Sequence, residues 1–243
     1  MSEHDFLDKV SSTYKTSTSM QDLFSRKQTF IRMLEYLKPE MHVLELGCSD
    51  GWFTSQLANY VDKVTSIEGS KNFYNNVSEM NLENVDLKYS LFEDFYTDQR
   101  FDFIANTYVM EHVLDPVNVM LKTLRFLKPG GISFIAVPNA TALSRQIGKE
   151  MGYYSSLYDL TENDLCYGHR RVYDLKGLEE DVKKSGYKVI DKGGISLKIL
   201  ADFQLDELYS SGFLTEKHSD AFISIANKYP ELSGQIFIVG EKL

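Results

Sequence analysis

The stretch Val43-Leu44-Glu45-Leu46-Gly47-Cys48-Ser49-Asp50-Gly51 decides the fold of this chain. It joins an apolar, β-rich run to a turn of small residues, and such a turn lets the backbone approach a ligand closely. A helical pattern follows at once, and the N-terminus of a helix offers free N–H groups. The stretch therefore predicts a strand, a ligand-binding turn and a helix, in that order.

Outward from this stretch, β-rich runs alternate with helical patterns as far as residue 138. The predicted strands are Met41–Leu46, Lys63–Glu68, Val85–Tyr89, Phe101–Thr107 and Ile132–Val137, and the predicted helices are Gly51–Asn59, Ser70–Met80 and Asp115–Leu127. Lys128-Pro129-Gly130-Gly131 is expected to end the last helix and turn the chain. The alternation predicts an α/β fold with a doubly wound, parallel sheet, whose ligands bind beyond the carboxyl ends of the strands.

Three further segments flank this core. Residues 1–40 have helical spacing, most clearly over Gln21–Leu37, and residues 139–172 form a long stretch of the kind that often covers an active site. Residues 173–243 predict helices at Asp174–Ser185, Phe203–Tyr209 and Glu216–Lys228, extended pieces at Lys188–Ile190 and Ser196–Ile199, and a closing strand at Gln235–Gly240. We expect one domain over residues 1–243, with N-terminal helices (1–40), a core (41–138), a lid insert (139–172) and a C-terminal part (173–243).

Charge and composition exclude several classes of protein. The formal net charge is −9, and the longest basic runs are the pairs Arg170–Arg171 and Lys183–Lys184, which argues against a nucleic-acid partner. Two cysteines, Cys48 and Cys166, are too few for a disulfide framework or a zinc site. Neither an apolar signal region nor an apolar run of about 18 residues is present. We expect a cytoplasmic protein without a membrane partner, of unknown oligomeric state.

Two acidic residues define the chemistry of the turn. Glu45 precedes it, and Glu68 ends the second strand, where a carboxylate can accept hydrogen bonds from both hydroxyls of a ribose. A pyrophosphate would require Gly-x-Gly-x-x-Gly, which the turn lacks, and Glu45 would repel it. The same carboxylate suits the cationic amino group of a methionine moiety.

This pattern resembles the first motif of class I methyltransferases that depend on S-adenosylmethionine (SAM), an acidic residue followed by x-Gly-x-Gly-x-Gly. Ser49 stands where the middle glycine is usual, which implies either a negative φ or modest strain there. The resemblance covers about residues 41–138 and, more loosely, the rest to the C-terminus. It implies a Rossmann-like sheet of seven strands, mostly parallel with the last strand antiparallel, SAM as cofactor and S-adenosylhomocysteine (SAH) as product.

The resemblance also implies where the cofactor lies. Leu91-Phe92-Glu93-Asp94 falls where the family contacts adenine, Phe101-Asp102-Phe103-Ile104 matches the strand that ends at the methyl group, and Leu127-Lys128-Pro129-Gly130-Gly131 matches the turn before the fifth strand. The cofactor-binding residues predicted in this way are Glu45, Gly47, Cys48, Ser49, Gly51, Glu68, Gly69, Leu91, Phe92, Glu93 and Thr107.

The segment after the fourth strand, Tyr108–Val113, is similar to the Glu-His of many small-molecule methyltransferases. Methyl transfer depends mainly on positioning, but a hydroxyl acceptor also needs a base, for which an imidazole is suited near neutral pH. We predict Glu111, His112 and His169 as catalytic residues; the alternative is that Glu111 and His112 orient the next helix. Some RNA methyltransferases bind a metal through Glu-x-x-Glu-His-His, but Tyr108 and Val113 replace two of those ligands, so no metal is expected.

The insert ends in Gly168-His169-Arg170-Arg171-Val172-Tyr173, which looks like the Gly-His-Arg-x-Tyr segment that borders the substrate pocket of related enzymes. Arginine forks bind carboxylate or phosphate, so an anion clamp is predicted; the alternative is that surface arginines anchor a helix. The predicted substrate-binding residues are Tyr108, Asn139, Tyr158, Arg170, Arg171, Tyr173 and Lys198.

The sequence thus predicts SAM-dependent methyl transfer to an oxygen or nitrogen of a small polar or anionic metabolite, such as a sugar, an amino-acid derivative or a natural-product precursor. Three alternatives stay open: an RNA or protein methyltransferase, a non-catalytic SAM-binding module, and an enzyme of another nucleotide. The acidic charge and the absence of an Asn-Pro-Pro-Tyr-type motif after the fourth strand argue against the first.

Overall fold

The computed structural model describes residues 2–13 and 19–243; residues 1 and 14–18, part of the predicted N-terminal helical segment, lie outside it. Seven strands of the described chain form one sheet in the order β3-β2-β1-β4-β5-β7-β6. The strands are β1 (His42–Leu46), β2 (Lys63–Glu68), β3 (Val85–Tyr89), β4 (Phe101–Thr107), β5 (Leu127–Pro138), β6 (Lys188–Gly194) and β7 (Gln235–Glu241). All pairs among β1–β5 are parallel, and β7 is antiparallel to β5 and β6. The seven-stranded, mostly parallel sheet with an antiparallel last strand is confirmed.

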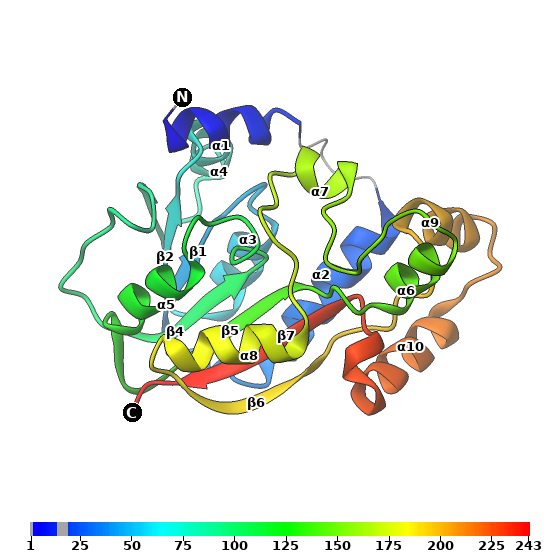
Figure 1. Cartoon of the computed structure of the whole chain (residues 1–243). Helices are drawn as coiled ribbons and strands as arrows, with labels where there is room; N and C mark the ends of the chain where they lie inside the picture. The colour runs from blue at the N-terminus through cyan, green and yellow to red at the C-terminus, as the bar shows by residue number, and fades with distance from the viewer. Residues whose placement is uncertain (1, 14–18) are drawn as a thin grey trace.

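Helices cover both faces of the sheet (Figure 1). They are α1 (Glu3–Ser11), α2 (Met20–Leu34), α3 (Trp52–Tyr60), α4 (Lys71–Ser78), α5 (Pro116–Leu124), α6 (Leu143–Glu150), α7 (Glu162–Cys166), α8 (Leu175–Lys184), α9 (Asp202–Ser210) and α10 (Glu216–Lys228). On one face, α5 and α8 bury Met120 and Leu178 against the strands. On the other, α2 and α3 bury Met33 and Leu57. Apolar residues at helical spacing therefore close two cores around a sheet whose strands are buried on both sides.

Two predicted boundaries in the core are wrong. Lys128-Pro129-Gly130-Gly131 was expected as a turn between a helix and a strand, but it lies inside β5, and α5 ends earlier, at Leu124. Phe101 pairs with Leu127, and the register shifts before Phe103 pairs with Ile132. The Pro-Gly-Gly segment is thus an irregularity within the strand, a role for which glycine is suited.

The edge of the sheet also differs from expectation. β6 extends to Gly194, whereas Ser196–Ile199 is not a strand and makes only an isolated bridge, from Leu197 to Ser233. Most side chains of β6 are exposed or half-buried, so the apolar alternation that marks a strand in sequence is weak there.

The carboxyl ends of β1, β2 and β4 lie beneath α1 and α7, which approach each other at the top of Figure 1. The Thr13 hydroxyl donates to the Cys166 carbonyl over 3.0 Å, which ties the end of α1 to the end of α7. The N-terminal segment and the insert therefore meet over the carboxyl ends of the strands, where ligands are expected.

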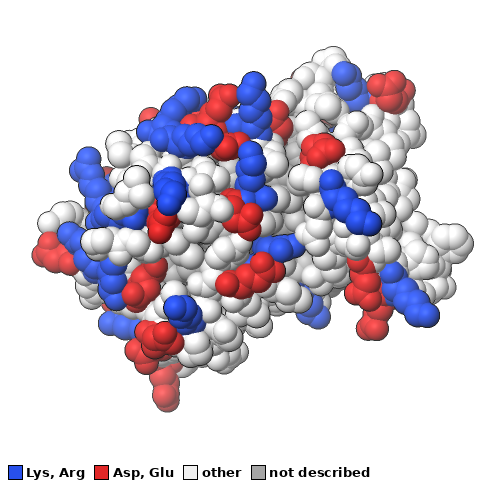
Figure 2. Space-filling view, turned by 90° about the horizontal axis from the view of Figure 1, so that it is seen from below, with Lys and Arg blue, Asp and Glu red and all other residues white. Residues whose placement is uncertain are grey.

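The surface seen from below in Figure 2 shows basic and acidic side chains interspersed. The basic pair Lys183–Lys184 also lies among acidic residues. Lys183 pairs with Glu179 at 2.7 Å and Lys184 with Asp181 at 3.2 Å. No helix within residues 2–13 and 19–243 combines the length and the apolar character that a bilayer crossing requires.

Candidate active site

The turn between β1 and α3 has the tight backbone conformation that its small residues predicted. Gly47, Ser49 and Gly51 all have positive φ, at 75°, 46° and 83°. Of the two alternatives for Ser49, the structure shows the strained one, because a serine in the left-handed region clashes with its own backbone. A side chain at Gly51 would place its Cβ 2.7 Å from the Met80 sulfur, so glycine is needed there for space as well as conformation.

Glu45, in β1 just before this turn, is buried, with 1% of its surface exposed. Its Oε2 accepts hydrogen bonds from the hydroxyls of Thr54 (2.8 Å) and Ser66 (2.6 Å). Its Oε1 is buried and has no partner among the described residues. Burial raises the pKa of this carboxyl to about 7, despite the two hydroxyls. Glu45 therefore keeps one free acceptor for a cationic group.

Glu68, at the end of β2, is held by backbone amides. Oε2 accepts from the amides of Cys48 (3.1 Å) and Ser49 (3.2 Å), and Oε1 accepts from that of Ser70 (2.7 Å). Burial raises its pKa although these amides oppose the shift. The side chain thus joins the turn after β1 to the end of β2, and it is 6% exposed.

Helix α1 covers this end of β2. Asp8 accepts hydrogen bonds from the Ser70 hydroxyl (2.8 Å) and the Lys71 amide (2.6 Å), and a ring nitrogen of His4 lies 2.7 Å from the Gly69 carbonyl. A Cβ at Gly69 would be 2.6 Å from the Leu7 side chain. Helix α1 therefore covers the region predicted to bind the ribose.

The remaining predicted cofactor residues converge on the same place. Leu91 reaches toward Gly69 and Phe92 toward Gly47, since a Cβ at these glycines would lie 3.1 and 3.8 Å from the two side chains. The Glu93 carbonyl accepts a hydrogen bond from Lys122, and Thr107 ends β4 beside the turn. Leu91 and Phe92 therefore lie beside the glycines that follow β2 and β1.

Three predicted catalytic residues also meet. Glu111 and His112 follow β4, and His169 comes from the end of the insert; the two imidazole rings lie 4.7 Å apart in an edge-to-face arrangement. The Glu111 carboxyl is 1% exposed, and neither of its oxygens has a partner in the described part of the chain. Burial raises its pKa to about 7, while burial and the charge of His169 lower the pKa of His112 to about 3.

Asp164 completes this cluster, and the sequence argument missed it. Its Oδ1 lies 3.0 Å from Nδ1 of His169, and its Oδ2 accepts from the Thr161 amide (2.8 Å) and hydroxyl (2.7 Å) and from Arg145 (3.3 Å). Burial lowers the pKa of His169, but Asp164 and Glu111 outweigh it and the net shift is upward. The Thr-x-x-Asp spacing of a capping box was the available signal for this residue.

The two arginines of the predicted anion clamp contact protein atoms. Arg171 donates to the carbonyls of Met110 (2.7 Å), Val113 (2.5 Å) and Leu114 (3.0 Å), and so braces the segment that carries Glu111. Arg170 pairs with Glu3 at 2.7 Å and lies over the Phe6 ring. A half-buried guanidinium requires acceptors; Arg171 has three carbonyls, whereas Arg170 has Glu3 but keeps a buried Nε without a partner among the described residues.

Other predicted substrate residues likewise have protein partners. The Asn139 amide donates to the carbonyls of Glu231 and Ser233 and accepts twice from Thr141, which uses its full hydrogen-bonding capacity. The remaining pairs are Tyr108 with Thr29 (2.7 Å), Tyr158 with Asp174 (2.7 Å), Tyr173 with Asp181 (3.1 Å) and Lys198 with Asp202 (2.6 Å). Tyr108 has φ of 59°, a second strained non-glycine residue at this edge of the sheet.

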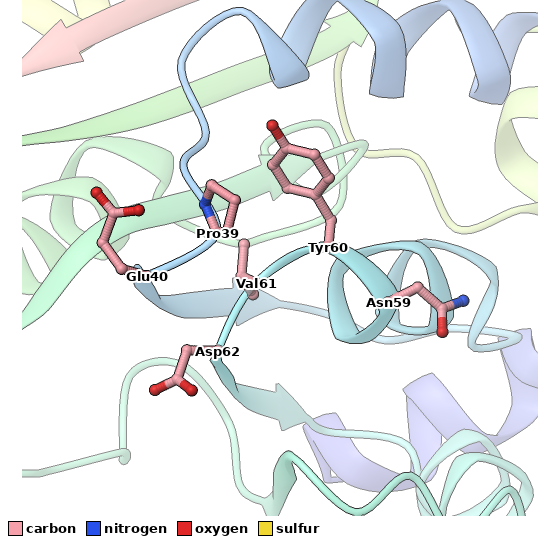
Figure 3. Close-up of a pocket in the computed structure, with 6 residues that line it drawn as sticks. All are labelled: Pro39, Glu40, Asn59, Tyr60, Val61 and Asp62. Atoms are coloured by element: carbon pink, nitrogen blue, oxygen red, sulfur yellow. The ribbon is translucent and has the colours of Figure 1, made fainter.

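A surface hollow of about 490 Å³ lies elsewhere, and Figure 3 shows its lining. Its residues are Pro39, Glu40, Asn59, Tyr60, Val61 and Asp62. They precede β1 and β2 and therefore lie at the amino ends of these strands, opposite the site described above. None of them is a predicted site residue, so the carboxyl-end surface is the better candidate.

Comparison with known proteins agrees with this geometry. A family model described as a methyltransferase domain matches residues 20–192. The ubiquinone biosynthesis O-methyltransferase of Dictyostelium discoideum mitochondria is 32% identical over 120 residues, which cover 43% of this chain and 37% of that protein. The enzyme of the same name from Rickettsia akari is 25% identical over 174 residues, 63% of this chain and 67% of that one. The chain thus spans about a third to two thirds of the length of these relatives.

Solved structures share the fold at low sequence identity. The [4+2]-cyclase SpnF has a TM-score of 0.62 and 17% identity, covering 94% of this chain and 84% of its own. The N-methyltransferase NodS from Bradyrhizobium japonicum WM9, solved with SAH, has a TM-score of 0.58 and 12% identity, covering 93% and 89%. With the family match over most of the length, the chain belongs to the methyltransferase-domain family, and its fold is that of class I, SAM-dependent methyltransferases.

Proposed function

We propose that this protein transfers the methyl group of SAM to a hydroxyl oxygen of a small molecule. The observation that carries the proposal is the cluster of buried Glu111 with half-buried His112 and His169 at the carboxyl edge of the sheet. A hydroxyl is a poor nucleophile until it loses its proton, so a site for hydroxyl acceptors needs groups that assist this loss. The relatives named above are O-methyltransferases of ubiquinone biosynthesis, which favours oxygen over nitrogen.

The cofactor would lie along the turn after β1. The free Oε1 of Glu45 would pair with the amino group of the methionine part, and Glu68 would reach the ribose with the lone pairs that its amide partners leave over. Leu91 and Phe92 would border the adenine. In this placement the sulfonium lies toward the end of β4, on the side of Glu111.

The acceptor would enter between this surface and the cover formed by α1 and the insert. Such a cover excludes water from the reacting groups, and a small acceptor fits beneath it more readily than a folded macromolecule. The arginines are not assigned to the acceptor, because both hold protein atoms.

The test uses SAM with a deuterated methyl group and fractions of a cell extract. Mass spectrometry should find the label on a hydroxyl oxygen of a small molecule, and calorimetry should show SAH binding. The absence of SAH binding would overturn the cofactor site. Label recovered only in RNA or protein would overturn the acceptor class.

A further inference from the structure

The Glu111 carboxylate is buried without any protein partner for either oxygen among the described residues. An isolated buried carboxylate is costly, and proteins normally pair it or use it to hold a cation. Two imidazoles stand beside it, and one ligand atom from each of Glu111, His112 and His169 lies within 4.8 Å of the others. Two nitrogens and one oxygen therefore lie close together.

Neighbouring groups fix the orientation of both imidazoles. Nδ1 of His169 is engaged by Asp164 at 3.0 Å, which leaves Nε2 as its free ring nitrogen. Asp164 is itself fixed by Thr161 and Arg145. The Gly168 carbonyl is a hydrogen-bond partner of His112 and occupies one of its ring nitrogens. Carboxylates and carbonyls in this position are the usual supports of metal-binding histidines, because they fix the tautomer and the ring orientation.

We propose that Glu111, His112 and His169 bind one divalent transition-metal cation, such as Zn²⁺ or Mn²⁺. Two imidazoles and a carboxylate suit such cations, whereas Mg²⁺ and Ca²⁺ prefer oxygen ligands throughout. Three ligand atoms at about 2.1 Å from one cation lie about 3.4 Å apart in a tetrahedral site, so the three side chains would move closer together on binding. Three protein ligands leave coordination positions open, as in catalytic sites.

The inference rests on the proposed function and specifies how the acceptor loses its proton. A hydroxyl oxygen bound at an open position would have a lowered pKa and would release its proton to solvent. The oxygen then forms the new C–O bond as the S–CH₃ bond breaks, and the electron pair of that bond stays on sulfur as a neutral thioether. One proton is released per methyl transferred. The histidines then serve as ligands, not as bases.

This inference differs from the expectation, drawn from the sequence, that no metal binds. That expectation rested on one segment, compared with Glu-x-x-Glu-His-His, in which Tyr108 and Val113 stand in place of ligands. In the structure the Tyr108 hydroxyl is engaged with Thr29 and takes no part, but the missing second imidazole comes from His169, which lies 57 positions after His112 in the chain. The proposed site is thus assembled from two segments that the fold brings together.

The test is calorimetric titration of the metal-stripped full chain with Mn²⁺, and separately with Co²⁺, whose visible absorption reports its ligands. We expect one site per chain, with a Co²⁺ spectrum free of thiolate bands. His169→Ala and His112→Ala should each weaken binding at least tenfold. The matched control is His218→Ala, since His218 is exposed on α10, and it should bind like wild type. No site in wild type, or equal loss in the control, would overturn the proposal.

Asp164→Asn keeps a similar shape but removes the charge behind His169, and it should weaken Co²⁺ binding roughly 10–100-fold. SAH affinity, measured on the same samples, should stay within twofold and shows that each variant is folded. SAH binding without metal binding would overturn this inference and leave the proposed function standing. Metal binding without SAH binding or methyl transfer would overturn the proposed function instead.

Discussion

At the scale of single residues, the turn after β1 stores strain at Ser49. Its φ of 46° is costly for any residue with a Cβ, by roughly 1–2 kcal/mol. We therefore expect Ser49→Gly to raise the free energy of unfolding by about 1 kcal/mol, part of the gain being offset by the greater freedom of glycine in the unfolded chain. Urea denaturation measures this. Ser49→Ala keeps the strain and serves as control; an equal gain there would contradict the explanation.

A second residue-scale prediction concerns Glu45, whose pKa burial raises to about 7 from an ordinary value near 4.5. The folded state thus holds the proton more tightly than the unfolded state. Glu45 therefore lowers stability progressively between about pH 4.5 and 7, and the full cost, up to about 3 kcal/mol, applies above pH 7. Glu45→Gln should make the cofactor-free protein more stable than wild type at pH 8 but not at pH 4.5.

Denaturant titrations at the two pH values measure this effect, with Glu40→Gln as the exposed control that should change neither. The same Glu45→Gln variant should bind SAH more weakly, because the amino group of the ligand loses its ionic partner. If the stability of Glu45→Gln depends on pH as that of wild type does, burial does not raise the pKa of Glu45.

Single residues also mark the limit of sequence reasoning. Glu45 and Glu68 could be placed because each lies within a few positions of a strand end, where local pattern determines position. The partners of Arg170 and Arg171 could not, because a guanidinium binds whichever acceptor the fold brings near. Here those acceptors are Glu3, 167 positions away, and carbonyls about 60 positions away.

At the scale of helices and strands, β2, β3 and β4 were predicted with their observed bounds, whereas the segment at the β6 edge was predicted poorly. Phe101–Thr107 was predicted with its observed bounds because it is rich in β-forming Phe and Ile, although Asp102 and Asn106 interrupt its apolar side chains. At the edge, β6 and Ser196–Ile199 lack that signal. Lys128–Gly131 was misassigned because Pro and Gly mark a turn and a strand irregularity equally well.

The element with the clearest testable role is α1, which Asp8 fastens to the start of α4. Asp8 both anchors α1 and caps α4, accepting from the Ser70 hydroxyl and the Lys71 amide. Removal of the Asp8 side chain should lower the free energy of unfolding by about 1 kcal/mol, and the backbone of α1 should be the first to open to solvent. We expect Asp8→Ala to speed hydrogen exchange in α1 and at the start of α4, but not in α8. Lys9→Ala, on the exposed side of α1, is the matched control. Uniform exchange rates across all three proteins would contradict an anchoring role.

At the scale of the whole molecule, the sheet brings together ligand groups that the chain keeps far apart. Glu45, Glu68 and Glu111 come from the ends of three strands, and His169 arrives from an insert that returns over the same edge. One cofactor that contacts all of these strand ends should stabilise the molecule as a unit. Because the net charge of the protein is −9, a polyanionic ligand should not stabilise it.

Thermal unfolding tests this consequence. A ligand at about 100 times its Kd stabilises a protein by roughly 2.7 kcal/mol, which for a chain of this size raises the unfolding temperature by roughly 5–11 °C. We expect that shift with SAM and SAH, and none with NAD, ATP or tRNA at the same concentrations. Gly47→Val should abolish it, since the side chain would enter the strained turn beside Val109 and Phe92. A shift with NAD or ATP of equal size, or tRNA binding that weakens steeply with salt, would mean that the carboxyl edge of this sheet serves a different ligand.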